Sequence, residues 1–399
     1  MPRVNGFGRG RSVCKPESCE GCALHKIGAG FTEIEVGKRY ESTRLLLIGE
    51  ASGESEARES LPFRPHAQSG SLLADAMREV HVDRAEVAIT NVLRCRPPKD
   101  WLEGAPWQYG ATQHCITNHL TRVISELQPN AILALGSTAY RALTNPPKGR
   151  YGTLEYTHGY VVRGAGCAEG IPVIGTPHPA FLRRGNAHLI PWLQRDLRRA
   201  FHVAAGKLVR GKSWGYGVDD FECGGYRTAP TINEAWSYVE SLDPGLPLAF
   251  DIETPYSTRS DEDERTSFTD RDIRLFQCTQ RRGEGIALPF RDEFVEVVRV
   301  ICQFQNVGKV GFNNWSFDDP VLRANGVEID ETDDAMVMFG TYWSDLPKNL
   351  QAAAQMCGFP FPWKSLGESD LALYGCIDVD ATLTVYEWMR KVLSNESLG

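Results

Sequence analysis

Short apolar runs alternate with helical spacing in the first half of the chain. The runs that predict strands lie at 44–48, 87–91, 131–135 and 171–175. Apolar residues recur with helical spacing at 70–80 and 115–127. Strands that alternate with helices in this way pair in parallel and are covered on both faces. The pattern therefore predicts an α/β domain of three layers, α/β/α, with a parallel sheet.

A different kind of apolar run, at 248–254, ends in two acids separated by one residue. Side chains alternate across a strand, so Asp251 and Glu253 share one face while Ile252 points into the core. Two carboxylates this close repel each other unless a positive group neutralises them, and the usual one is a divalent cation bound by oxygen ligands. The sequence thus predicts a metal site here. The alternative is a solvated strand end.

Three further polar residues follow in matching contexts. Asp318 comes after an apolar strand at 307–312, at the expected start of a helix. Tyr374 and Asp378 stand four residues apart, which places a phenol and a carboxylate on one face of a helix. We therefore expect these residues to join the first two acids in one site.

The order Asp-x-Glu, Asn-x-x-Phe-Asp and Tyr-x-x-x-Asp resembles the tyrosine subclass of the DEDD 3′→5′ exonucleases, which includes the proofreading domain of family A DNA polymerases. The resemblance implies a ribonuclease H-like α/β domain that cleaves phosphodiesters with two Mg²⁺ or Mn²⁺ ions. It assigns Tyr374 to orienting the attacking water and Asn314 to the substrate. Asp319 and Asp380 are rival ligands on spacing alone, but the motif frames disfavour them. The metal ligands that the resemblance implies are Asp251, Glu253, Asp318 and Asp378.

Four cysteines of the first half have the spacing of a metal centre. Cys19 and Cys22 form a Cys-x-x-Cys pair in a polar, turn-rich stretch, and Cys95 and Cys115 follow. Four thiolates in such loops suit zinc and an iron-sulfur cluster equally well. Four unrelated buried thiols are the alternative, and Cys14 could replace Cys19. Eleven cysteines without export features indicate reduced thiols in a cytoplasm.

The ends of the predicted strands carry a second resemblance. The segments Gly49-Glu-Ala-Ser-Gly53, Pro62-Phe63, Thr90–Pro98 and His178-Pro-Ala180, with the Cys-x-x-Cys-x-Leu-His start, together resemble the family 4 uracil-DNA glycosylases. The resemblance extends roughly over 14–199. It implies a glycosylase fold and a 4Fe-4S cluster, which favours iron-sulfur over zinc. The cluster ligands would be Cys19, Cys22, Cys95 and Cys115.

The same resemblance assigns roles in base removal. Phe63 would stack on a flipped uracil, and Asn91 would read its amide edge. His178 would hydrogen-bond the carbonyl that gains charge as the base leaves, and Glu50 would position water or stabilise the cationic sugar. Taken singly, these residues are better explained as a core Phe, a capping Asn and a loop Glu. The set as a whole favours the catalytic interpretation.

Charge separates the two halves of the chain. The net charge is −8, but residues 1–212 carry 28 Lys and Arg against 19 Asp and Glu, whereas residues 213–399 carry 15 against 32. The first half, at +9, is the expected holder of the DNA backbone. The second half, at −17, is compatible with a nuclease because bound metal ions supply local positive charge.

Composition also places the expected boundaries. Residues 1–12 are rich in Gly and Arg without an apolar core, so they predict a flexible basic arm and not a signal peptide. We expect a glycosylase-like domain at 13–205, a linker at 206–228 and an exonuclease domain at 229–399. No run of eighteen apolar residues predicts a membrane span, and we expect a cytoplasmic protein.

Three hypotheses follow for function. In the first, both halves are enzymes that act on DNA, one excising uracil and the other degrading a single-stranded or frayed 3′ end in repair or proofreading. In the second, the first half is a degenerate DNA-binding module, because Ser52 stands where the family usually has a rigid proline. In the third, the chain is the proofreading subunit of a separate DNA polymerase, because about twenty residues follow Asp378, too few for a further domain.

Overall fold

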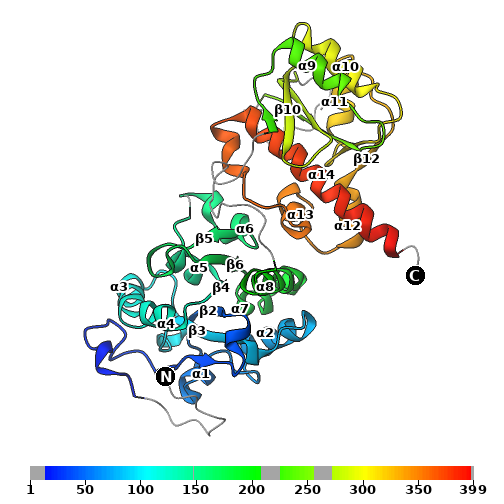
Figure 1. The fold of residues 1–399 in the computed structure, drawn as a ribbon. Coiled ribbons are helices and arrows are strands. Elements are labelled where there is room, and N and C mark those ends of the chain that lie inside the picture. The colour runs from blue at the N-terminus through cyan, green and yellow to red at the C-terminus, as the bar shows by residue number, and fades with distance from the viewer. Residues whose placement is uncertain (1–13, 147, 208–224, 256–271, 397–399) are drawn as a thin grey trace. The chain divides into compact units, whose positions relative to one another are not determined.

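The computed structural model describes residues 14–146, 148–207, 225–255 and 272–396, and it divides into two compact units, Met1–Phe221 and Glu222–Gly399 (Figure 1). The division falls within the segment 206–228 that the sequence predicts as a linker. Most of that segment and the predicted basic arm at 1–12 lie outside the described residues. The predicted domain limits therefore stay predictions.

The described part of the first unit contains a six-stranded sheet. Four central strands run parallel, and a short strand pairs antiparallel at each edge. The α/β class predicted for this half is confirmed. The strand order is β1 (Glu35–Val36), β3 (Val87–Leu93), β2 (Leu45–Ala51), β4 (Ala131–Leu135), β6 (Pro172–Thr176) and β5 (Val161–Arg163).

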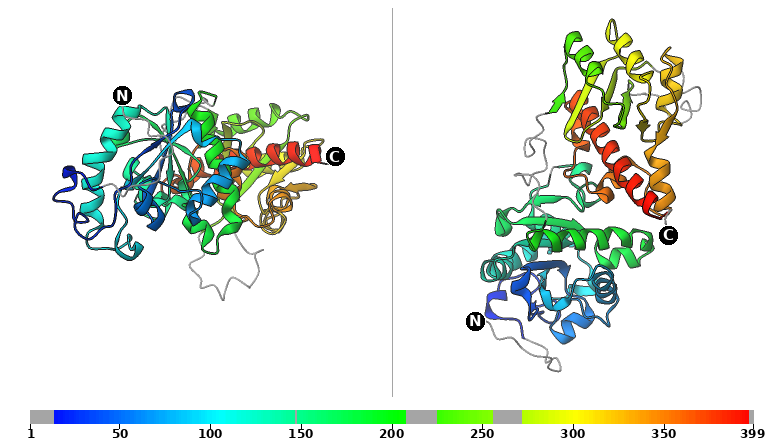
Figure 2. Two further views of the ribbon diagram at one scale, coloured as in Figure 1. Left: turned by 90° about the horizontal axis from the view of Figure 1, so that it is seen from below. Right: turned by 45° about the vertical axis from the view of Figure 1, so that its right-hand side comes forward.

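The central strands are buried because their apolar runs are continuous. Every residue of β3 and β4 is buried, as is typical of parallel strands covered on both faces. Helices lie around this sheet in Figure 2, and α5 and α8 both pack on β4. The helices are α1 (Glu54–Glu59), α2 (Gln68–Glu79), α3 (Gln108–Cys115), α4 (Thr121–Leu127), α5 (Ser137–Leu143), α6 (Leu154–Thr157), α7 (Pro179–Arg183) and α8 (Ile190–Ala204).

One predicted helix differs from the structure. Spacing predicts a single helix at 115–127, but α3 begins at Gln108 and ends at Cys115, and α4 begins at Thr121. A π-helical turn, Ile116–Leu120, joins them. Such turns widen a helix locally and often lie at functional sites. Here the turn begins directly after the cysteine predicted as a cluster ligand.

The second unit also has a six-stranded sheet within the described ranges, but a mixed one. Strand β8 pairs antiparallel with β9 and parallel with β11. The α/β class predicted for this half is confirmed as well. The strand order is β12 (Thr332–Asp334), β11 (Lys309–Gly311), β8 (Leu248–Glu253), β9 (Leu275–Thr279), β10 (Glu284–Pro289) and β7 (Gly225–Arg227).

The two faces of β8 carry different side chains, apolar on one and acidic on the other. Phe250 and Ile252 belong to an apolar core shared with helices α9 (Ile232–Glu240) and α10 (Phe294–Cys302). By strand alternation, Asp251 and Glu253 point to the opposite face. Helix α14 (Leu371–Glu396) packs along β8, β9 and β10. The remaining helices are α11 (Asp318–Ala324), α12 (Ala335–Tyr342) and α13 (Leu350–Cys357).

No helix within the described ranges combines the length and the hydropathy that a membrane span needs.

Candidate active sites

The first candidate site lies where the parallel strands of the first unit end. Glu50 is the next-to-last residue of β2, Asn91 lies near the end of β3, and His178 follows β6. Phe63 belongs to the loop between α1 and α2. The carboxyl ends of neighbouring parallel strands meet at one edge of a sheet, where α/β folds place their ligands. The structure brings all four predicted residues to this edge.

The carboxamide of Asn91 is buried without a partner. The residue is 1% exposed, and neither its side-chain oxygen nor its nitrogen makes a hydrogen bond in the part of the chain that is described. Burying such a group is costly unless a ligand supplies the missing partners. Gly49 provides the space beside it, because a Cβ there would collide with Asn91 Oδ1 and lie 2.6 Å from the Phe63 ring. The amide and the ring thus meet over Gly49.

The His178 ring lies beside the Phe63 ring, and it is a neutral imidazole. Its ring centroid lies 5.8 Å from that of Phe63. Its Nδ1 accepts a hydrogen bond from the Ala180 N–H at 3.1 Å, so the ring proton is on Nε2. Burial lowers the pKa of His178, although the nearby Glu50 carboxylate opposes this. The ring can therefore donate one hydrogen bond from Nε2 without carrying a positive charge.

The side chains of Glu50 and His178 both lie close to Gly136. A Cβ at Gly136 would lie 2.6 Å from Glu50 Oε1 and 3.0 Å from His178 Cβ, and the φ of +94° also favours glycine. The same carboxylate oxygen accepts the Thr138 N–H at 3.3 Å. Glu50 is thus held at the start of α5, beside the imidazole.

The turn after β2 is held by hydrogen bonds of Ser52 and not by a proline ring. Its N–H donates to the Leu93 carbonyl at 3.2 Å, and its hydroxyl hydrogen-bonds that of Thr32. Ser52 is 2% exposed. A proline at this position has no N–H and could not make the bond to Leu93. The turn after β2 is therefore anchored to the end of β3.

The four cysteines of the predicted cluster gather beside this sheet edge. Cys19, Cys95 and Cys115 are buried, and Cys22 packs against the same small core. Cys14, the alternative ligand, is exposed. Cys22 and Cys19 come from the N-terminal loop, whereas the other two come from the end of β3 and the end of α3. The thiols therefore join three separate segments of the chain.

The thiols are close enough to affect one another. Burial raises the pKa of Cys95 to about 12, and the neighbouring Cys115 adds to the shift. Burial likewise raises the pKa of Cys115 to about 11, with contributions from Cys22 and Cys19. Lys15 lies beside them and donates to the carbonyls of the N-terminal loop. Burial thus raises the pKa values of three of these thiols, and the gathering of four thiols at one point is typical of a metal centre.

The second candidate site is a group of carboxylates on the α14 side of β8. One oxygen each from Asp251, Glu253 and Asp378 lie within 4.8 Å of one another. Asp318, at the start of α11, accepts the Ile252 N–H at 3.1 Å. It therefore stands next to the two acids of β8. The structure brings the four predicted carboxylates together.

Burial and mutual repulsion make these acids hard to ionise without a cation. Burial raises the pKa of Asp251 well above its usual range, and the charges of Asp318, Glu253 and Asp378 raise it further. The pKa of Glu253 is raised to about 8 by burial and by Asp378. That of Asp318 is raised to about 7, chiefly by burial. Such a group favours a bound positive charge.

Two residues that the sequence did not indicate contact the carboxylates. Lys364 Nζ donates to both oxygens of Asp378 at 3.0 Å and to the Tyr374 hydroxyl at 2.8 Å. The Trp363 Nε1–H donates to Asp378 Oδ1. Burial raises the pKa of Tyr374 far above its usual range, so the phenol keeps its proton. The segment 363–364 lies outside all three motifs, and no spacing in the sequence relates it to them.

Asn314 is fully buried, and its side-chain NH₂ donates to Asp319 Oδ1 at 3.2 Å and to Thr332 Oγ1 at 2.9 Å. These bonds tie the loop after β11 to the start of α11 and to β12. Its side-chain oxygen has no hydrogen-bond partner among the described residues. The predicted contact of Asn314 with substrate stays a prediction.

The rival carboxylates are engaged elsewhere. Asp319 accepts the Thr332 hydroxyl at 2.7 Å in the network of Asn314. Asp380 accepts the Tyr226 hydroxyl at 2.6 Å and the Gly283 N–H at 2.9 Å, which fastens β7 to α14. Neither belongs to the group formed around Asp251.

Solved structures similar to this chain include nucleases. The catalytic core of RRP6 from Trypanosoma brucei matches with a TM-score of 0.36 and 17% identity over 48% of this chain and 52% of that one. Escherichia coli RNase D matches with a TM-score of 0.31 and 16% identity over 41% and 44%. Likeness at this level assigns no function, so the second unit is interpreted from its own carboxylates.

Curated relatives match the other part of the chain. The model of the uracil DNA glycosylase superfamily matches residues 37–202. Type-4 uracil-DNA glycosylases are 31% identical in Thermotoga maritima, over 43% of this chain and 81% of that protein, and 30% identical in Archaeoglobus fulgidus, over 41% and 77%. Together with the residues that converge at the sheet edge, these matches show that the chain belongs to the type-4 uracil-DNA glycosylase family.

Proposed function

We propose that this chain excises uracil from DNA with its first unit and removes nucleotides from a DNA 3′ end with its second. The observation that carries the first activity is the unpartnered amide of Asn91 beside the Phe63 ring, whose centroid lies 5.8 Å from that of His178. The observation that supports the second is the group of buried and half-buried carboxylates around Asp251.

The amide of Asn91 complements one edge of uracil. That edge presents a ring N–H donor beside a carbonyl acceptor, and a carboxamide offers an acceptor and a donor in return. Cytosine presents the reverse pattern, because its amino group donates and its ring nitrogen accepts. A base that has left the duplex could stack on Phe63 while Asn91 reads this edge. The two unmade hydrogen bonds would then be formed by the substrate.

His178 and Glu50 are placed to lower the barrier to base departure. A leaving uracil gains negative charge on a carbonyl oxygen, and the Nε2–H of His178 would donate to it. A neutral imidazole suits this role because it needs no proton to be added first. The Glu50 carboxylate would stabilise the positive charge on the sugar or position the water that attacks it.

The Asn91→Leu variant tests whether the Asn91 amide recognises uracil. We expect uracil release to fall by about 100-fold, because the transition state loses a hydrogen-bonding partner. The melting temperature should stay equal or rise, since an unsatisfied buried amide is replaced by an apolar side chain of similar size. Steady-state release of uracil and a thermal melt measure both. Asn118→Leu is the matched control, because the Asn118 side chain is exposed on the π-helical turn. An Asn91 variant that is destabilised or fully active would contradict the assignment.

The carboxylate group fits divalent cations in composition and in charge. Carboxylate oxygens are the ligands that Mg²⁺ and Mn²⁺ prefer, and burial together with mutual repulsion keeps the pKa values of Asp251 and Glu253 raised although Lys364 lies nearby. Bound metal ions would supply an activated water and stabilise the leaving 3′ oxygen. The protonated Tyr374 would orient that water. The residues that would hold the two ions are Asp251, Glu253, Asp318 and Asp378.

The four thiols would hold a 4Fe-4S cluster. Three are buried, and the four come from separate segments of the chain: the N-terminal loop, the segment after β3 and the end of α3. A cluster here would join the N-terminal loop to the ends of β3 and α3, which makes its role structural. It would also keep Asn91 in place, since Cys95 lies four residues beyond it on the same segment.

DNA that contains uracil, and a single-stranded or frayed 3′ end, are the proposed substrates. The positive charge of the first half supports binding to the phosphate backbone. Reduced thiols and a DNA substrate favour the cytoplasm. A separate DNA polymerase as partner stays a prediction, because no contact in the structure bears on it.

A further inference from the structure

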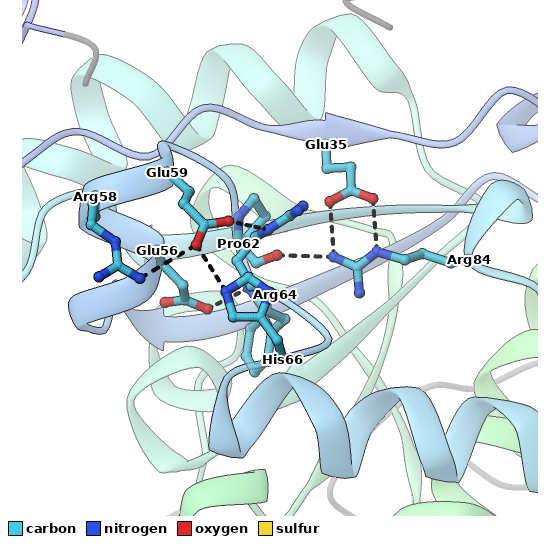
Figure 3. A network of polar contacts seen from close by, with 9 residues as sticks. Glu35, Glu56, Arg58, Glu59, Pro62, Arg64, His66 and Arg84 are labelled. Atoms are coloured by element: carbon cyan, nitrogen blue, oxygen red, sulfur yellow. Dashed lines mark hydrogen bonds and ion pairs between the residues drawn. The ribbon is translucent and has the colours of Figure 1, made fainter. Parts of the chain in front are cut away.

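The peptide group between Pro62 and Phe63 is held at both of its polar atoms. Glu56 Oε1 accepts the Phe63 N–H, and Arg84 Nη2 donates to the Pro62 carbonyl at 2.9 Å. Figure 3 shows the two side chains reaching this peptide. A peptide group is planar, so fixing its C=O and its N–H fixes the plane from which the Phe63 backbone continues.

Both side chains of this clamp are themselves anchored. Glu56 is 7% exposed, and its second oxygen accepts the Gly53 N–H at 2.6 Å, across the first turn of α1. Arg84 makes a two-pronged ion pair with Glu35, at 2.7 and 2.8 Å. Burial raises the pKa of Glu56, and the N–H groups of Gly53 and Phe63 and the charge of Arg84 oppose that shift. The clamp therefore connects α1, the edge strand β1 and the start of β3.

The clamped residue has a backbone conformation that phenylalanine rarely adopts. Phe63 has a φ of +45°, in the left-handed region where a Cβ crowds the following carbonyl. Such a conformation persists only where the surroundings hold it. On the far side, Gly70 lets α2 approach closely, because a Cβ there would lie 2.6 Å from the Phe63 carbonyl carbon. The ring is thereby directed to Asn91 and His178.

A second network nearby has a different character. Glu59 pairs with Arg64 at 2.9 Å and with His66 at 2.8 Å, and these bonds join side chains to side chains (Figure 3). They do not reach the backbone of Phe63. Orientation of the ring thus depends on Glu56 and Arg84.

We propose that Glu56 and Arg84 are positioning residues that set the Phe63 ring for stacking on the extruded base. This inference rests on the proposed function, because it takes Phe63 as the surface on which the base stacks. Neither residue touches the base. They act through one peptide group, and their effect on uracil release disappears when the ring is absent.

The central experiment is a double-mutant cycle of Glu56→Gln and Phe63→Ala. Glutamine keeps the size of the side chain but has a single acceptor oxygen, so it cannot accept both the Gly53 and the Phe63 N–H. Glu56→Gln alone should slow uracil release about 10-fold, because hydrogen bonds to charged groups are the strong ones. In the Phe63→Ala background it should add no further loss. Losses that multiply would overturn the proposal.

The control for this cycle lies on the same helix. Glu54 is two residues before Glu56, its side chain is exposed, and it pairs with Arg96 at 3.5 Å. Glu54→Gln should leave uracil release unchanged. If Glu54→Gln slowed release as much as Glu56→Gln does, the loss of a negative charge from α1 would explain both effects. The proposal would then fail.

Amide exchange tests the clamp without reference to activity. In Glu56→Gln the Phe63 amide should exchange about 10-fold faster, whereas amides of β2 and β3 keep their protection. Unchanged exchange at Phe63 would overturn the clamp even if the wild-type protein released uracil. Conversely, faster exchange in a protein that releases no uracil would leave the clamp standing and refute the proposed function.

A second variant covers the case in which Glu56→Gln does not fold. Arg84→Lys keeps the positive charge but loses the two-pronged contact with Glu35 and the reach to the Pro62 carbonyl. It should slow uracil release and speed exchange at Phe63 in the same proportion. Full activity with unchanged exchange in Arg84→Lys would refute the role of Arg84.

Discussion

Exonuclease activity should fall by at least about 100-fold in the Asp251→Asn variant, the order expected when a metal site loses a group that shapes it. The reason is that Asp251 is one of the four carboxylates proposed to hold the ions, and the charges of the other three all act on it. The measurement is the shortening of end-labelled single-stranded DNA from its 3′ end with Mg²⁺ or Mn²⁺.

The same substitution should stabilise the metal-free protein. Asparagine is uncharged at every pH, so the variant avoids the cost of keeping the Asp251 carboxyl protonated in the folded state, and it should melt at a higher temperature than the wild type in chelator. Added Mg²⁺ should raise the melting temperature of the wild type more than that of the variant, since only the wild type binds the ions well. Asp345→Asn, on an exposed loop, is the control. Undiminished degradation of DNA by Asp251→Asn would refute the metal site.

Loss of the cluster should have the second large effect. The protein purified without oxygen should be brown and hold about four iron and four sulfide ions per chain, and Cys95→Ser should be colourless and melt at a lower temperature. The cause is that Cys95 joins the end of β3 to two other segments. Iron analysis and the visible absorption spectrum measure the outcome.

Cys14→Ser provides the matched control, because this thiol is exposed and stands five residues from Cys19. It should keep its iron and its colour. If Cys14→Ser lost its colour while Cys19→Ser kept its iron, Cys14 and not Cys19 would be the cluster ligand. A colourless wild type with one zinc per chain would contradict the iron-sulfur assignment.

The strands that carry the sites were predictable because their signal is local. Continuous apolar runs such as Leu45–Ile48 and Ala131–Leu135 have no stable place except a strand covered on both faces. Strand β7 had no such signal. It is three residues long, lies at the sheet edge, and depends on β10 and on the contact of Tyr226 with Asp380. Short edge strands of this kind are defined by their partners and not by their own sequence.

The candidate sites were predictable where chemistry follows a strand end. Asn91 and His178 could be related to each other because parallel strands finish at one edge. The residues that hold the sites could not be found in this way. Glu56 and Arg84 stand 28 positions apart in the sequence and meet through the Pro62–Phe63 peptide group. The reach of Glu56 back to Gly53 does have a sequence signal, a glutamate three residues after a helix start.

Asn314 shows what spacing within a motif leaves out. Its position four residues before Asp318 places it near the metal ligands in sequence, but its amide finds Thr332 on a neighbouring strand. Lys364 shows the same limit, since a lysine beside a metal site is visible only once α14 packs on β8. Spacing relates residues within one element, and it does not reveal partners that tertiary packing brings in.

The most direct test of the account is release of free uracil by the Asp251→Asn variant, in which the exonuclease is silenced. Single- and double-stranded DNA with one uracil should yield free base and an abasic site, and a further His178→Ala substitution should slow the reaction by about 100-fold. DNA without uracil should remain intact. If no base is released from either substrate although the protein binds DNA in a salt-sensitive way, the first unit is a DNA-binding module and the account is contradicted.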